Sequence, residues 1–248
     1  MRAIFRDELV GLYLHGSLAM GSFNPARSDI DLLAVVKYPT LSSVRFELAR
    51  ALLELSAVPA ALEFSVILDK DLTYWKYPTP FEFHFGEDAR ASFLADLAVE
   101  EWINWPDADR FDPDLAGHAM VAKRRGRTLW GRAVDETFPD VPREHYLASI
   151  RQDFIWARAR LNREPTLAHY LTLNCARTLR YLREDFVGSK IEGGRWALTR
   201  APAEFRHAVA AALASNDGSD PSAPIEAEAV RAFCDHMLAL IAQELETA

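Results

Sequence analysis

The length and composition of the chain indicate a folded protein with a substantial core. It has 248 residues, of which 50% are hydrophobic, so disorder is not expected and there is room for one large domain or two modest ones. Acidic residues outnumber basic residues by 36 to 28, and the net charge of −8 argues against nonspecific binding to a nucleic acid backbone. A cationic small molecule is a better match to this charge.

The cysteines and the apolar segments indicate the cellular compartment of the protein. Cys175 and Cys234 show neither metal-binding spacing nor a disulfide framework, and Cys175 lies in an apolar helical pattern typical of a buried thiol. The N-terminus has no apolar signal core with a cleavage site, and the longest apolar runs are far shorter than the ~20 residues that cross a membrane. We therefore expect a cytoplasmic monomer without membrane or nucleic acid partners.

The first third of the chain alternates strand and helix signals. Strands are predicted at 11–15, 28–36 and 61–68, where β-branched or aromatic residues are bounded by turn formers. Residues 42–57 carry apolar residues on one broad helical face, which predicts a helix between the second and third strands. The order strand, short helix, strand, helix, strand indicates an α/β layer.

After about residue 90 the apolar pattern becomes helical. Pro139 and Pro142 lie just before a helix that is expected to begin at Arg143, and a domain boundary is predicted there. Further helices are predicted at 166–184, 202–214 and 225–246, and together they form a helical bundle. The predicted domains are residues 1–142 and 143–248.

Two carboxylates one residue apart lie in the second predicted strand. Asp29 and Asp31 would point to the same face of that strand, roughly 6 to 7 Å apart along the backbone. Two such charges ~4 Å apart repel by ~4 kcal/mol at an effective dielectric near 20, and a shared proton, a basic neighbour or a divalent cation relieves this repulsion. The pair predicts a Mg²⁺ site that holds a nucleotide, and a solvated strand edge is the structural alternative.

A Gly-Ser pair and a third acid strengthen this prediction. Gly16 allows a tight turn after the first strand, Ser17 offers a hydroxyl group, and the next residues can begin a helix whose free amides bind phosphate. In the third strand the apolar residues alternate onto one face and Glu63 takes the other, so Glu63 can reach the same site if the two strands are neighbours. There it could ligate the cation or act as general base toward an acceptor hydroxyl, whereas an exposed Glu on an edge strand is the alternative.

These motifs resemble the signature of the nucleotidyltransferase superfamily, and specifically of the streptomycin and spectinomycin adenylyltransferases that inactivate aminoglycoside-type antibiotics. The Gly-Ser and Asp-x-Asp pattern is in LHGSLAMGSFNPARSDIDLLAVV, and the third acid is in LEFSVIL. Residues 173–198, LNCARTLRYLREDFVGSKIEGGRWAL, resemble the signature of the C-terminal helical domain of that family. The resemblance implies an α+β fold, in which an N-terminal nucleotidyltransferase (polymerase-beta-like) α/β domain with a mixed sheet is followed by an α-helical bundle domain.

The same resemblance implies roles for individual residues. Asp29 and Asp31 would bind Mg²⁺, and Glu63 would be the catalytic base. The positions that would contact ATP, two of them in the helical domain, are Gly16, Ser17, Ser28, Arg177 and Lys190. The implied reaction is transfer of AMP from Mg-ATP to a hydroxyl of a cationic antibiotic, streptomycin or spectinomycin, with release of pyrophosphate.

Two positions depart from the family pattern where the drug would bind. In FHFGEDAR, Asp88 stands where the family has a Trp that packs on the drug, and Leu167 stands where the family has an acidic residue. Asp88 and Asp153 are candidate contacts for a cationic substrate, and a solvated surface acid is the alternative for each. A stacking surface could instead come from tryptophans, namely Trp102, Trp105 and Trp156.

Two other hypotheses stay open. The same chemistry could act on a different small-molecule acceptor, or the chain could be a nucleotide-binding regulator without transfer activity. The intact set of three acids argues against the regulator, because a protein that only binds a nucleotide has no need for Glu63.

Overall fold

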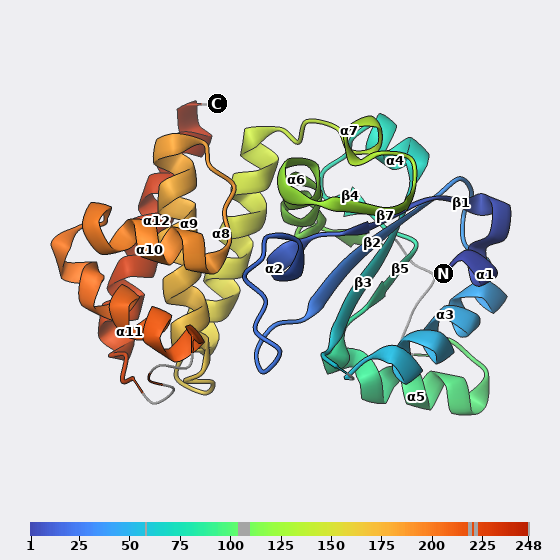
Figure 1. Cartoon of the computed structure of the whole chain (residues 1–248), viewed down its shortest axis with the longest axis horizontal. Helices are drawn as coiled ribbons and strands as arrows, with labels where there is room; N and C mark the ends of the chain where they lie inside the picture. Colours follow the sequence, from blue (N-terminus) through green and yellow to red (C-terminus); the bar gives the residue numbers. More distant parts are fainter. Residues whose placement is uncertain (58, 104–109, 218–219, 221–222, 248) are drawn as a thin grey trace. The chain divides into compact units, whose positions relative to one another are not determined.

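Two units of different secondary structure make up the chain (Figure 1). The structure is a computed structural model that describes residues 1–57, 59–103, 110–217, 220 and 223–247. One unit, Met1–Val141, combines a sheet with helices, and the other, Pro142–Ala248, is helical. Helices and a mixed sheet occur together, as the predicted α+β class requires.

A five-stranded mixed sheet organises the first unit. Its strand order is β5 (Phe83–Phe85), β3 (Leu62–Leu68), β2 (Ile30–Val36), β1 (Leu9–Leu14) and β7 (Arg127–Gly131). β2 and β3 are parallel and are connected through α3 (Ser42–Leu55), whereas the other neighbours in the sheet pair antiparallel. A separate pair consists of β4 (Thr79–Pro80) and β6 (Phe111–Asp112). The short helical turns are α1 (Arg2–Phe5), η1 (Arg6–Glu8), α2 (Gly16–Ala19) and η2 (Glu87–Ala89).

Different helices cover the two faces of this sheet (Figure 1). On one face the alternate apolar residues of β2 and β3, such as Val36 and Phe64, pack with Leu48 of α3 and Phe93 of α5 (Arg90–Val99). The opposite face lies toward α4 (Asp69–Thr73), α6 (Leu115–Arg125) and α7 (Val134–Thr137). Because side chains alternate along a strand, the acids of β2 and β3 belong to this second face.

Strands also occur beyond residue 90, where the sequence predicted only helices. β7 is an edge strand in which four of the five residues are exposed, so it lacks the alternation of buried and exposed residues by which a strand is recognised. Its place in the sheet comes from antiparallel pairing with β1, where Gly131 lies opposite Gly11. The expectation of helix throughout this region is therefore wrong for β6 and β7.

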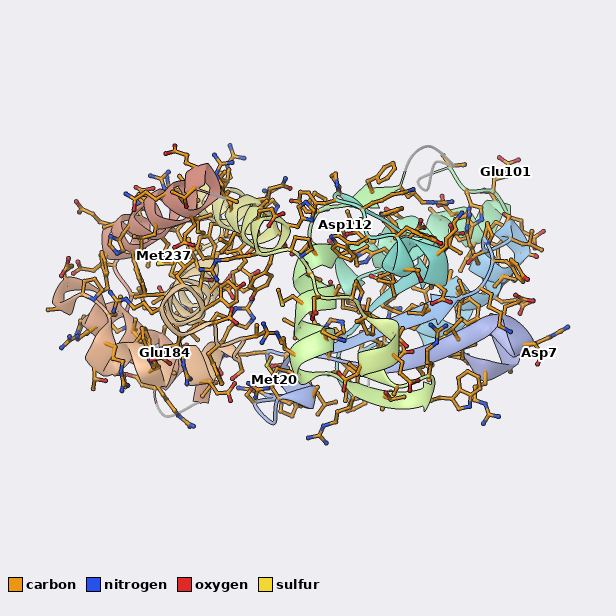
Figure 2. All side chains as sticks on the ribbon, turned by 90° about the horizontal axis from the view of Figure 1, so that it is seen from above. Asp7, Met20, Glu101, Asp112, Glu184 and Met237 are labelled. Carbon is orange, nitrogen blue, oxygen red and sulfur yellow. The ribbon has the colours of Figure 1, made fainter. Side chains whose placement is uncertain are left out.

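The second unit is built around α9 (Leu167–Glu184). This helix packs against α8 (Arg143–Arg160), α10 (Lys190–Arg200), α11 (Arg206–Asp217) and α12 (Ala227–Thr247), and η3 (Ala203–Phe205) precedes α11. Met237 of α12 is completely buried and lies among these helices (Figure 2). α10 approaches α9 closely because Gly193 has no side chain, and a Cβ atom there would overlap Cα of Arg177. Among the described helices, none is both long enough and apolar enough to span a bilayer.

A buried tyrosine hydroxyl connects β1 with the segment that follows β7. Tyr13 is fully buried, and its hydroxyl lies 2.7 Å from Thr137 Oγ1 and 3.0 Å from the carbonyl oxygen of Arg132. Replacing Tyr13 with phenylalanine keeps the ring and removes these contacts, so we expect the free energy of unfolding to fall by about 1 to 2 kcal/mol. Urea unfolding measures the change, and Tyr38→Phe at an exposed tyrosine is the control. An unfolding midpoint that stays the same in Tyr13→Phe would contradict the prediction.

Candidate active site

The parallel pairing of β2 and β3 brings two of the predicted acids together. Asp31 is the ladder partner of Glu63, so the two side chains leave adjacent strands on the same face of the sheet. The condition that the sequence left open, that the two strands are neighbours, is met. The Glu63 side chain is 30% exposed, which leaves its carboxylate accessible to a bound molecule.

Asp29 lies beside this pair but not in the strand. β2 begins at Ile30, whose backbone N–H donates to the carbonyl oxygen of Ala61 at 2.8 Å, and the ladder with β3 starts at the same residue. The predicted strand began two residues too early, and Asp29 is an exposed residue of the preceding loop. The prediction that Asp29 belongs to the strand is therefore wrong, although Asp29 is close enough for its charge to act on Asp31.

The loop after β1 is pressed against Asp31. The backbone N–H of His15 donates to the carbonyl oxygen of Asp31 at 3.0 Å, and Gly16 follows with a φ of +63°. A Cβ atom at Gly16 would overlap Oδ2 of Asp31, so only glycine allows the carboxylate to lie where it does. Ser17 has a buried Oγ atom without a hydrogen-bond partner among the residues that the structure describes.

Ser28 belongs to the loop that leads into β2. Its Oγ atom accepts a hydrogen bond from the backbone N–H of Asn24 at 3.2 Å, and its own N–H donates to the Asn24 carbonyl oxygen at 2.8 Å. These bonds close the turn of residues 24–28. The hydroxyl hydrogen of Ser28 is not used by either bond and can be donated to an anion.

A histidine of α6 contacts Glu63 from above this face of the sheet. Nε2 of His118 lies 3.5 Å from Oε1 of Glu63 and 3.2 Å from Oδ2 of Asp114. Burial alone would lower the pKa of His118, but the carboxylates of Glu63 and Asp114 outweigh it and raise that pKa to about 10. The ring also meets His15 edge to face at a centroid distance of 5.0 Å, and burial holds the pKa of His15 well below its usual value.

Asp31 has an unusual protonation equilibrium for a carboxylic acid. Burial and then the charge of neighbouring Glu63 raise its pKa from 3.8 to about 7. A divalent cation relieves such a cost, and carboxylate oxygens are the ligands that Mg²⁺ prefers. The donor set of Asp29 and Asp31 therefore fits Mg²⁺, although within the described ranges no three His, Cys, Asp or Glu side chains are already grouped as a metal-binding site.

The raised pKa of Asp31 predicts a stability change with pH. Because the folded state holds the proton more tightly than the unfolded state, the stabilising contribution of Asp31 is complete below pH 3.8 and is lost as the pH rises through about 7. In the presence of a chelator, we expect Asp31→Asn to lose less stability than the wild type between about pH 5 and about pH 8. Urea unfolding at both pH values checks this, with exposed Asp7→Asn as the control; equal losses in all three proteins would refute it.

The candidate substrate residue of the first unit lies at the same end of the sheet. β5 runs antiparallel to β3 with Phe85 opposite Phe64, so Asp88 in the turn after β5 is near the end of β3 where Glu63 lies. Asp88 is exposed. Farther into the sheet, Ser65 Oγ and His84 Nδ1 are 2.9 Å apart, and burial lowers the pKa of His84. The structure therefore places Asp88 where a molecule near Glu63 could meet it.

The candidates of the second unit are held by contacts within that unit. Asp153 accepts a hydrogen bond from the hydroxyl of Tyr170 at 2.9 Å, and Nζ of Lys190 lies 4.8 Å from the centroid of the Tyr170 ring. Lys190 begins α10, where Ser189 caps the helix in a reciprocal capping box with Glu192. Arg177 is half-buried on α9. These contacts give Asp153 and Lys190 defined positions, and the ATP and substrate roles of all three remain predictions.

The tryptophans have different environments. Trp102 stacks on Phe46 at a centroid distance of 4.2 Å and donates its indole N–H to Ser42, so it packs on the α3 side of the sheet, away from Glu63. Trp156 is 45% exposed, and the guanidinium of Arg160 lies over its ring. Trp105 lies outside the described residues.

Sequence reasoning missed His118 and Asp114. Their spacing of four residues at the start of a helix was the available signal, because it places a carboxylate and an imidazole on one face. Nothing in that spacing says that α6 lies over Glu63, so the contact becomes visible only in the fold.

The comparisons with known proteins agree with the sequence motifs. Residues 136–240 match the family model described as aminoglycoside adenylyltransferase, C-terminal domain. Over 239 residues the chain is 26% identical to the aminoglycoside (3'') (9) adenylyltransferase of Klebsiella pneumoniae. This alignment covers 92% of this chain and 86% of that protein. It is 28% identical over 153 residues to the spectinomycin 9-adenylyltransferase of Campylobacter jejuni, and this alignment covers 60% of this chain and 56% of that protein.

The fold is also that of a solved relative. The chain aligns with the crystal structure of spectinomycin adenyltransferase AAD(9) from Enterococcus faecialis with ATP and spectinomycin at a TM-score of 0.76 and 19% identity, over 97% of this chain and 94% of that chain. The predicted fold class is thereby confirmed. The comparisons also confirm the predicted resemblance to the aminoglycoside adenylyltransferases. They confirm with it the predicted enzyme class, nucleotidyltransferase.

Proposed function

We propose that this protein transfers AMP from ATP to a hydroxyl group of an aminoglycoside-type antibiotic, streptomycin or spectinomycin, and releases pyrophosphate. The observation that supports this most is the pairing of Asp31 with an accessible Glu63 beside the Gly16 loop. It puts a candidate cation ligand and a candidate base next to each other, as nucleotidyl transfer to a hydroxyl requires. The names of the relatives support the acceptor class.

Glu63 is the general base in this proposal. As its carboxylate accepts the proton of the acceptor hydroxyl, the hydroxyl oxygen bonds to the α-phosphorus of ATP. The bond from that phosphorus to the oxygen bridging to the β-phosphorus breaks, and pyrophosphate leaves with the bonding electrons. Removing the proton as the new bond forms avoids a cationic oxygen in the product.

Asp29 and Asp31 would hold Mg²⁺, which supplies neutralisation of charge on the phosphate oxygens when bound. The raised pKa of Asp31 supports this role, since a cation would offset the burial of its charge. Gly16, Ser17 and Ser28 would contact the phosphates of ATP, and the buried, unpartnered hydroxyl of Ser17 supports that assignment. We assign two further ATP contacts to the helical unit, where the side chains are cationic: Arg177 and Lys190.

The acceptor is the less constrained part of the proposal. Asp88 and Asp153 are proposed to bind cationic groups of the drug. However, Asp88 stands where the family has a drug-packing Trp, and Leu167 stands where it has an acid. These two differences favour one alternative, the same transfer chemistry on another hydroxyl-bearing small molecule.

Pyrophosphate release by the purified protein with Mg-ATP tests the function. The assay is run with spectinomycin, with streptomycin and without a drug, and mass spectrometry of the drug identifies an added AMP. Asp29→Ala and Asp31→Ala should abolish release, whereas Asp7→Ala, at an exposed acid, should not. Release that depends on another acceptor would favour the alternative, and tight ATP binding without transfer to any acceptor would favour a nucleotide-binding regulator.

A further inference from the structure

His118 contacts the proposed base through its Nε2 atom, which is hydrogen-bonded to Asp114 and within ion-pair distance of Glu63. Its Nε2 atom lies 3.5 Å from Glu63 and 3.2 Å from Asp114, and the Asp114 side chain is much the more exposed of the two, 59% against 30%. The Nε2 atom therefore lies between a carboxylate at the helix start, to which it is hydrogen-bonded, and the carboxylate of the base. A hydrogen bond to an ionised acceptor is stronger and more directional than one between neutral groups.

The imidazole itself is held from other sides. Asp114 precedes α6, and the backbone N–H of His118 donates to the Asp114 carbonyl oxygen at 3.1 Å, so the two side chains come from one turn of backbone. The ring packs edge to face on His15, which is buried at the end of β1 with 3% exposure. His15 in turn is joined to the backbone of Asp31. The ring of His118 is thus anchored to the same loop and strand that carry the candidate metal ligand.

The other side chain that acts on the Glu63 carboxylate is Asp31, through a side-chain hydrogen bond and through its charge. A glutamate has three side-chain torsions, and the last of them is broad and roughly two-fold, so an accessible carboxylate can rotate freely unless a donor holds it. Asp31 can hold Glu63 by this hydrogen bond only while it carries a proton, and once it is ionised its charge repels Glu63. A donor on the opposite element would keep the carboxylate in one orientation.

From this geometry we infer that His118, anchored by Asp114 and His15, is a positioning residue that orients the Glu63 carboxylate toward the acceptor hydroxyl. It does not take the proton itself, because its Nε2 atom already faces carboxylates. The inference rests on the proposed function, in which Glu63 is the base. It adds a residue of α6 to the part of the proposed site that holds the candidate base and the candidate metal ligands.

Two substitutions of His118 separate positioning from folding. Leucine removes the N–H, whereas glutamine can present an N–H near the position of Nε2. We expect His118→Leu to lower kcat by about 10- to 100-fold with a KM for ATP within about twofold of the wild type, and His118→Gln to recover most of the loss. His207→Leu, at an exposed histidine of α11, should leave both constants unchanged. If glutamine and leucine are equally impaired, or if neither is, the inference is wrong.

Two further measurements distinguish this inference from the proposed function. In the double variant with Glu63→Gln, His118→Leu should cost little beyond the cost of Glu63→Gln alone, and additive losses would overturn the inference. Without any substrate, NMR of the imidazole should show the His118 pKa falling in Glu63→Gln and in Asp114→Asn. An unchanged pKa in Glu63→Gln would refute the contact, even if the enzyme is active. If the His118 pKa falls in Glu63→Gln but the wild type transfers AMP to no acceptor, the contact between His118 and Glu63 is real. The proposed function and the positioning role are then both rejected.

Discussion

Replacing Glu63 with glutamine is expected to lower kcat for AMP transfer by about 10²- to 10⁴-fold, the usual contribution of a general base. The amide keeps the size and most of the polarity of the carboxylate but cannot accept the hydroxyl proton. Because Glu63 is assigned to the acceptor and not to the nucleotide, the KM for ATP should change little. Steady-state kinetics of pyrophosphate release with a saturating acceptor measure both constants.

A matched control keeps this prediction specific. Glu54→Gln changes an exposed glutamate of α3, on the side of the sheet away from the site, and should have wild-type kinetics. Nearly intact kcat in Glu63→Gln would show that Glu63 is not the base. A large rise in the KM for ATP with an unchanged kcat would instead assign Glu63 to nucleotide or metal binding.

The neighbouring acids were predictable because they depend on local rules. The apolar alternation of the strand at 61–68 assigned Glu63 to the face opposite the core, and parallel pairing with β2 then left Asp31 as its partner. The predicted start of the second strand was too early. Residue 29 fits the period of two, but pairing with β3 begins only at Ile30. A pattern in one segment does not reveal where hydrogen bonding to the next strand starts.

Local rules of this kind could not predict the contacts between α6 and the sheet face that carries Glu63. His118 and Glu63 come from segments far apart in the chain, and the amphipathic pattern of α6 says that the helix is half-buried without saying which face of the sheet it covers. The edge strand β7 was missed for a related reason. Its side chains are mostly exposed, so its place in the sheet depends largely on pairing with the backbone of β1.

Replacing Gly16 with alanine is expected to lower kcat for AMP transfer by about 100-fold or more, through displacement of Asp31. Gly16 has a φ of +63°, and an added methyl group would overlap Oδ2 of Asp31. The carboxylate would have to rotate away from the place where it lies beside Glu63. Alanine at a positive φ also costs about 1 to 2 kcal/mol of folding free energy, so a loss of activity alone would be ambiguous.

Gly21 resolves this ambiguity, because it has the same backbone strain without the clash. Its φ is +70°, and a Cβ atom there would have no other atom within 4 Å. Gly21→Ala should therefore lose the stability that a positive φ costs, about 1 to 2 kcal/mol, and keep most of its activity, as measured by urea unfolding and steady-state kinetics. If both variants lose activity equally, strain in the loop is the cause. If only Gly16→Ala loses kcat and its KM for ATP is unchanged, the loop acts by making room for the Asp31 carboxylate, whereas a raised KM for ATP would assign the loss to the phosphate contact of Gly16.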